Sequence, residues 1–249
     1  MALGRGGFVG NEHVSEGAPI LEVVGLHKSF GPHHVLRGID LTIPEGKITV
    51  IIGGSGSGKS VLLKHLIALL RPDRGAVLFR GQNIHQMTGR EMLGFRSKMG
   101  MLFQMAALFD SMSVYDNIAF PLREHRKIGK KEEQQLVMDS LHELNLYNVE
   151  HKNPAELSGG QRKRVSLARA TILRPEIILY DEPTTGLDPV MIKQVDDMIA
   201  ETQQRLNVTS IVISHDMAST FRIAHKVAML YKGEIIATGT PGEMRRNPR

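Results

Sequence analysis

Residues 53–60 read Gly53-Gly54-Ser55-Gly56-Ser57-Gly58-Lys59-Ser60, and this stretch decides the fold. It matches the pattern G-x-x-x-x-G-K-[ST], in which glycines let backbone N–H groups turn toward phosphates. The β-branched run Ile48–Ile52 before it predicts a strand buried on both faces of a parallel sheet. Residues 59–70 after it are predicted to form a helix that ends before Pro72. The stretch therefore predicts a nucleoside triphosphate site, with Lys59 on the phosphates and the Ser60 hydroxyl on Mg²⁺.

Strands and helices alternate on both sides of this loop, which predicts a mixed α/β fold. Residues 1–18 are rich in glycine and polar residues and are predicted to be a flexible leader, and 19–249 to be one nucleotide-binding unit without internal repeat. A helical insert is predicted at about 86–165. The expected strands outside the loop region are Leu21–Val24, Leu36–Ile43, Ala76–Phe79, Ile177–Tyr180, Ser210–Ile213, and a hairpin of Val227–Tyr231 with Glu234–Ala237.

Composition limits the setting of the protein. The 249 residues contain no cysteine, which excludes a disulfide framework and a cysteine-ligated metal. The net charge of +5 suits anionic partners, although a solvated basic surface accounts for it equally well. No apolar run reaches the roughly 18 residues of a membrane helix, and the N-terminus lacks a signal-peptide core. We therefore expect the chain on the cytoplasmic side, with membrane contact only through a partner. No zinc site is expected.

A second chemical motif lies where the predicted strand Ile177–Tyr180 ends in two acids, Asp181 and Glu182. Asp181 at the strand end can hold Mg²⁺, and Glu182 can polarise an attacking water as general base. A solvated acidic pair is common at strand ends, so the pair alone does not indicate a catalytic site. Together with the phosphate loop, it does.

A second possible phosphate cradle is Leu157-Ser158-Gly159-Gly160-Gln161, before a predicted helix that carries Arg162, Lys163 and Arg164. Ser158 can cap this helix, and the two glycines let an anion approach the helix N-terminus. A glycine-rich helix entry without any ligand is the alternative.

This segment, lying between a phosphate loop and an Asp-Glu strand, resembles the ATP-binding cassette (ABC) ATPases, and the resemblance covers nearly the whole chain from Leu21. It implies an α/β P-loop NTPase core of a mixed sheet with flanking helices, an antiparallel β subdomain and a helical subdomain insert. It also implies ATP hydrolysis with ATP and Mg²⁺ as cofactors. The working unit would be a head-to-tail dimer, in which Ser158, Gly159, Gly160 and Gln161 bind the ATP of the second copy.

The same resemblance assigns further residues one by one. Phe30 would stack on adenine, although an ordinary strand-end aromatic is the alternative. Gln104 would touch Mg²⁺ and water and sense the membrane partner. Asp188, which can also cap a helix before Pro189, would bind ATP in trans, and His215 would contact the γ-phosphate and orient the water. Mg²⁺ would be held by Ser60, Gln104 and Asp181, and ATP by Phe30, Gln104 and the loop Gly53, Gly54, Ser55, Gly56, Ser57, Gly58, Lys59, Ser60 and Val61.

Three positions depart from the common ABC pattern: Gly54, Val61 and Tyr180. Val61 stands where many relatives have a hydroxyl, so one contact near the α-phosphate is missing. None of the three removes a catalytic group, and activity is expected.

Residues 107–125 (ALFDSMSVYDNIAFPLREH) and 184–190 (TTGLDPV) resemble the Mla phospholipid-transport ATPases, the MlaF type. That resemblance implies an MlaE-like permease, a periplasmic MlaD-like lipid-binding protein and an MlaB-like STAS-domain protein as partners. The function implied is phospholipid transport between the inner and outer membranes, which maintains outer-membrane lipid asymmetry. The expected location is the cytoplasmic face of the bacterial inner membrane, and no nucleic acid partner is expected.

Alternatives remain open at this point. The cargo could instead be an amino acid or a lipoprotein, and a soluble ABC ATPase without a permease or a non-enzymatic nucleotide sensor is a further alternative. The apolar residues between 105 and 125 suit either a subdomain core or a groove for a short permease helix. Relatives often continue beyond an ending such as residues 241–249, so part of a C-terminal tail is expected to be missing.

Overall fold

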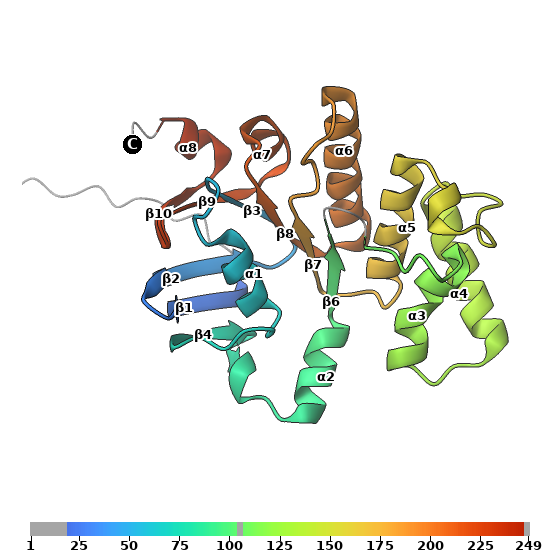
Figure 1. Cartoon of the computed structure of the whole chain (residues 1–249), viewed down its shortest axis with the longest axis horizontal. Coiled ribbons are helices and arrows are strands. Elements are labelled where there is room, and N and C mark those ends of the chain that lie inside the picture. Colours follow the sequence, from blue (N-terminus) through green and yellow to red (C-terminus); the bar gives the residue numbers. More distant parts are fainter. Residues whose placement is uncertain (1–18, 104–106, 247–249) are drawn as a thin grey trace, which may run out of the picture.

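The computed structural model describes residues 19–103 and 107–246 of the chain (Figure 1). The predicted leader at 1–18 lies outside these residues, as do Gln104 and the C-terminal residues 247–249. The described part contains an antiparallel sheet, a mainly parallel sheet, and helices packed around them. None of the described helices combines the length and the hydropathy needed to cross a bilayer.

The antiparallel sheet has the strand order β2-β1-β4-β5. Its strands are β1 (Pro19–Phe30), β2 (His33–Pro44), β4 (Arg74–Phe79) and β5 (Gln82–Asn83). In β2, buried Leu41 and Ile43 alternate with exposed Asp40 and Thr42, the period of two of a sheet with one solvated face. The antiparallel β subdomain is thus present.

The second sheet has the order β10-β9-β3-β8-β7-β6. All neighbouring pairs are parallel except β9 with β10, which form the predicted hairpin. All five residues of β3 are buried, as its β-branched sequence predicted. The strands are β3 (Ile48–Ile52), β6 (Met99–Leu102), β7 (Ile177–Asp181), β8 (Thr209–Ser214), β9 (Lys226–Tyr231) and β10 (Glu234–Gly239).

The helix after the phosphate loop is shorter than predicted: α1 spans Lys59–Leu66 and does not reach residue 70. Ala68 adopts a left-handed φ of 55°, and its amide donates to the carbonyl of His65. The amide of Leu69 donates to the carbonyl of Lys64, at 2.8 Å. This pair of bonds is the capping arrangement that ends many helices, here with alanine at the place usually taken by glycine.

The remaining helices follow the order of the chain. They are α2 (Gly89–Ser97), α3 (Val114–His125), α4 (Lys130–Glu143), α5 (Gly159–Thr171), α6 (Pro189–Leu206), α7 (Met217–Ile223) and α8 (Pro241–Arg246), with short 3₁₀ turns at Ile84–Gln86 and Pro154–Glu156.

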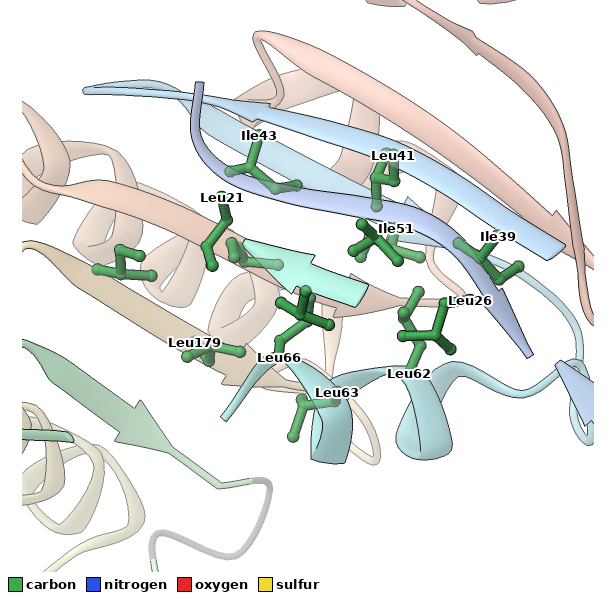
Figure 2. Close-up of a cluster of buried hydrophobic side chains, with 14 of the residues drawn as sticks. Leu21, Leu26, Ile39, Leu41, Ile43, Ile51, Leu62, Leu63, Leu66 and Leu179 are labelled. Carbon is green, nitrogen blue, oxygen red and sulfur yellow. The ribbon is translucent and has the colours of Figure 1, made fainter. Parts of the chain in front are cut away.

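Three buried clusters hold these layers together. The first joins the antiparallel sheet and α1 to one face of the parallel sheet, and Figure 2 shows Leu21, Ile51, Leu62 and Leu179 meeting in it. The second covers the other face of the parallel sheet with residues from α6, such as Val195 and Ile199. The phosphate loop therefore rests on a strand that is packed on both sides, which fixes its position.

The third cluster lies in the helical part of the chain and includes Ile118, Leu141 and Val165, from α3, α4 and α5. Figure 1 shows these helices beside the parallel sheet, on the side away from the antiparallel sheet. The predicted insert of 86–165 contains β6, which pairs with β7 in the parallel sheet, while the third cluster reaches Ile172. The division into domains stays a prediction.

Candidate nucleotide-binding site

The phosphate loop joins β3 to α1, and two of its glycines are required by the backbone. A Cβ at Gly53 would lie 2.4 Å from the carbonyl oxygen of Leu230. Gly58 stands just before α1 with φ 108°, a conformation that other residues rarely adopt. The loop then delivers Lys59 at the start of the helix, where unpaired N–H groups favour an anion.

Lys59 is almost fully buried, and its ammonium group points back into the loop. Its Nζ donates to the carbonyl oxygens of Gly53 at 2.8 Å and Gly54 at 3.1 Å. It also lies 3.6 Å from Oε1 of Glu182. The lysine ammonium thus lies between the phosphate loop and the acidic end of β7. This position suits the predicted contact of Lys59 with a terminal phosphate.

Glu182 follows β7 and adopts a left-handed φ of 47°. Its amide donates to the carbonyl of Ile213, and Thr185 Oγ1 donates to its Oε2 at 3.0 Å. The same oxygen lies 3.4 Å from Nδ1 of His215. Backbone strain at a carboxylate held by several partners is the kind of feature that concentrates at functional sites.

One open pocket of about 640 Å³ collects the predicted residues from three parts of the chain. Its lining comprises Val35, Gly54, Ser55, Gly56, Ser57, Gly58, Lys59, Ser60, Val61, Glu182 and His215. Sequence reasoning missed Val35, which comes from the antiparallel sheet, and Thr185, which orients Glu182. The three-residue spacing from Glu182 to Thr185 was the one available signal for the second.

The donors in this pocket, together with Asp181, which is next to the pocket residue Glu182 in the chain but does not itself line the pocket, fit phosphate and Mg²⁺. Among the described residues, Ser57 Oγ is buried and has no hydrogen-bond partner, although it lies in the loop that would surround a phosphate. Asp181 ends β7 beside Glu182, and burial together with the Glu182 charge raises the pKa of the Asp181 carboxyl. A cation held by Ser60 and Asp181 would offset the repulsion between the Asp181 and Glu182 carboxylates. Mg²⁺ prefers oxygen ligands, which both residues supply.

The second cradle is built as predicted at its helix start. Ser158 caps α5, its Oγ accepting from the amide of Gln161 at 3.2 Å, while Gln161 Oε1 accepts from the amide of Ser158 at 3.0 Å. A Cβ on Gly159 would meet nothing within 4 Å, so this helix start is open to an approaching group. Neither Ser158 nor Gly160 lines the pocket around Lys59.

The remaining predicted residues are distributed around this pocket. Asp188 caps α6 and accepts from the amides of Val190 and Met191, so its predicted structural role is confirmed. Phe30 ends β1 and is 47% exposed, which leaves its ring accessible but outside the pocket lining. The prediction for Gln104 falls outside the described residues.

The ABC transporter family profile matches residues 36–185 of the chain, a range that contains the phosphate loop, the Ser158 helix start and the Asp181–Glu182 strand end. The chain belongs to the ABC transporter family. The resemblance to this family inferred from the motifs is confirmed. The fold class is confirmed as well, since ABC cassettes share this arrangement of a mixed sheet, an antiparallel sheet and helices.

Two kinds of curated relative resemble this ABC chain. The "Probable ribonucleotide transport ATP-binding protein mkl" of Mycobacterium tuberculosis is 42% identical over 228 residues, covering 90% of this chain and 64% of that protein. The chain thus spans less than two thirds of the length of Mkl. The "Intermembrane phospholipid transport system ATP-binding protein MlaF" of Escherichia coli is 39% identical over 231 residues, covering 93% of this chain and 86% of MlaF.

Solved ABC structures resemble it too. CbiO1 of Clostridium perfringens, described as part of the ABC transporter complex CbiONQ, superposes with a TM-score of 0.84 at 30% identity, covering 92% of this chain and 91% of CbiO1. The cassette MJ0796, described as dimeric, superposes with a TM-score of 0.79 at 26% identity, covering 89% of this chain and 98% of MJ0796. A further MJ0796 structure is described as a post-hydrolysis state with ADP and Pi.

Proposed function

We propose that this chain is the ATP-hydrolysing subunit of an ABC transporter. The proposal is based on one observation: Lys59, Glu182 and His215 line the same pocket as the phosphate loop. Lys59 and the loop amides bind the phosphates, and the Glu182 carboxylate accepts a proton from the attacking water. His215 beside that carboxylate orients the water. Mg²⁺ would be held by Ser60, Asp181 and Gln104, and it would neutralise negative charge on the phosphates.

The active unit is a head-to-tail dimer, in which the helix start at Ser158 reaches the γ-phosphate in the partner's pocket. Two surface features support this arrangement. The Ser158 cradle is open yet stands outside the pocket of its own chain. Apolar side chains are also exposed beside two residues that are predicted to contact ATP, Asp188 and His215. Val190, near Asp188, is 68% exposed, and Met217, near His215, is 46% exposed. Exposed apolar groups at such places suit a protein interface.

The permease binds in a groove of about 660 Å³ on the helical side of the molecule. Exposed Leu93 of α2, Phe103 after β6, and Phe109 contribute to its lining, together with Phe120 and Pro121 of α3. An apolar groove of this kind accepts the apolar face of a short helix. Met99, Gly100 and Met101 of β6 also line the groove, and the neighbouring strand β7 ends at Asp181, just before Glu182. Movement of a bound helix can therefore reach the catalytic residue through these two strands.

Phospholipid is the proposed cargo, moved between the inner and outer membranes by a complex with MlaE-like, MlaD-like and MlaB-like partners. The similarity to the MlaF proteins along 93% of the chain supports this assignment. The chain would then sit at the cytoplasmic face of the inner membrane. The name of the Mkl relative favours a second candidate, a ribonucleotide cargo, with the same ATPase and the same groove.

The test is purification of the tagged full chain from detergent-solubilised membranes, followed by lipid extraction and an ATPase assay. Co-purification of a permease with bound phospholipid, and activity that disappears in Glu182→Gln, is the expected result. Leu93→Glu should release the permease, whereas Leu69→Glu should retain it, because Leu69 is similarly exposed but lies outside the groove.

A chain recovered alone, or with ribosomes, would refute the transporter role and leave the ATPase proposal standing. A permease recovered without lipid, in a complex whose ATPase responds to ribonucleotides and not to phospholipid, would favour the second cargo.

A further inference from the structure

A fully buried carboxylate lies on α6, among the apolar residues that face the parallel sheet. Asp196 is 0% exposed, next to buried Val195 and one turn before buried Ile199. An ionised carboxylate in such a place loses its hydration and needs compensating partners. Asp196 takes no part in the pocket around Lys59.

Within the described residues, Asp196 has two side-chain partners, and both belong to α7. Arg222 Nη1 donates to Oδ2 at 2.6 Å, and Ser219 Oγ donates to Oδ1. Burial raises the pKa of the Asp196 carboxyl, whereas the hydrogen bond from Ser219 and the charge of Arg222 lower it. The buried carboxylate thus accepts two directed hydrogen bonds, from Ser219 and from the partly exposed Arg222. These bonds fix the mutual orientation of α6 and α7 more narrowly than apolar contact does.

Helix α7 begins immediately after His215. Asp216 caps it, accepting from the amide of Ser219 at 3.0 Å, and the Asp216 amide donates to Ser214 Oγ. Ser219 is therefore bound both by Asp196 and by the cap residue next to His215. In the chain, β8 ends at Ser214, just before His215, and α7 begins at Met217, just after Asp216. The position of His215 therefore depends on both elements.

We propose that Asp196 is a positioning residue for ATP hydrolysis: through Ser219 and Arg222 it holds α7 in place, and so keeps His215 against Glu182. This inference rests on the proposed roles of Glu182 and His215. The same helix is capped by Asp188, the residue predicted to bind the partner's ATP, so α6 connects the predicted dimer contact to α7. A displacement of α6 at the dimer interface would then reach His215 of its own chain.

The test is a double-mutant cycle in the full-length chain, read by single-turnover hydrolysis of radiolabelled ATP with Mg²⁺. Asp196→Asn preserves the shape of the side chain and removes its charge. It should lower the rate about tenfold or more, because small misplacements of a catalytic group are costly, while affinity for a fluorescent ATP analogue stays within about twofold. Asp197→Asn, on the adjacent exposed residue, is the matched control and should leave both quantities unchanged.

The decisive arm places Asp196→Asn in a His215→Ala background. If Asp196 acts through His215, it causes no further loss there. The same fold-loss in both backgrounds, or a fall in nucleotide affinity equal to the fall in rate, would overturn the proposal. A His215→Ala chain as active as the wild type would refute the role of His215 and this inference with it.

Ser219→Ala is a second, milder variant, which keeps the proposal testable if Asp196→Asn does not fold. It removes one hydrogen bond and leaves the ion pair between Asp196 and Arg222 in place. The rate should fall by a smaller factor than in Asp196→Asn, and this loss should also vanish in the His215→Ala background. An unchanged rate with Ser219→Ala at an unchanged melting temperature would count against the link through α7.

Discussion

Glu182 and His215 meet at 3.4 Å, from Oε2 to Nδ1, just beyond the ends of two neighbouring parallel strands. Asp181 at the end of β7 pairs with Ile213 in β8, so the two following loops leave the sheet at the same edge. Thr185 Oγ1 donates a hydrogen bond to the same carboxylate oxygen at 3.0 Å. The register of β7 and β8 therefore brings together Glu182, the proposed base, and His215, the residue proposed to orient the water.

Glu182→Gln is expected to stop hydrolysis while ATP still binds. The amide keeps the size of the side chain but cannot accept the water proton, so turnover should fall by roughly a hundredfold or more. In ATP and Mg²⁺ the variant should form a stable dimer, measured by size-exclusion chromatography with light scattering. Glu201→Gln, on an exposed glutamate of α6, is the control and should behave as the wild type. A variant that stays monomeric would contradict the cradle in trans.

Lys59→Met is expected to weaken ATP binding. The ammonium group and its bonds to Gly53 and Gly54 are lost, together with the charge near Glu182. Charge-assisted contacts of this kind contribute about 1.5–3 kcal/mol, so the dissociation constant should rise by roughly tenfold to a hundredfold. Isothermal titration calorimetry measures it, with Lys193→Met on the exposed side of α6 as control. An unchanged dissociation constant would show that Lys59 does not bind ATP.

The sequence predicted the parts of this molecule that depend on local residues. The strand, loop and helix around Lys59 and the cap at Asp188 are short-range patterns, and the structure contains them. The end of α1 was misplaced because Ala68 adopts a left-handed conformation that nothing in its side chain announces.

Long-range pairing explains what else the sequence left out. Asp196 follows Val195 on a helix with a polar outer face, so its own segment favours exposure. Its burial depends on Arg222 and Ser219, which the fold brings to it from another helix. Val35 reaches the pocket in the same way, from strand β2 of the other sheet.

Gly53→Ala is expected to distort the phosphate loop. The added Cβ would lie 2.4 Å from the Leu230 carbonyl oxygen and 2.6 Å from Ser57 Oγ, and the carbonyl belongs to a buried strand that cannot move aside. Overpacking of this kind costs about 1–3 kcal/mol, so both the melting temperature and ATP affinity should fall. Gly54→Ala is the matched control, because a Cβ there meets nothing within 4 Å. Equal behaviour of the two variants would contradict the close approach at Gly53.

The last prediction concerns the loss of folding stability in acid caused by His65, a buried residue of α1. His65 is 0% exposed, its Nδ1 lies 2.7 Å from the carbonyl oxygen of Val61, and burial lowers its pKa below 6.5. Burial also lowers the pKa of His85 nearby. Below about pH 6.5 the unfolded chain takes up protons that the folded chain resists, so the stability contributed by the neutral imidazoles is lost as pH falls through this value.

His65→Asn should therefore flatten the fall in the free energy of unfolding between pH 7.5 and pH 5.5, measured by urea titration. The asparagine amide can still donate to the Val61 carbonyl but cannot bind a proton in this range. His151→Asn is the control, because it makes the same substitution at a side chain that is 93% exposed. Carboxyl groups with raised pKa values, such as Asp181, act in the opposite direction, but they are common to all three proteins and cancel in the comparison. An equal slope in His65→Asn and wild type would show that the imidazole of His65 accepts its proton as readily in the folded chain as in the unfolded one.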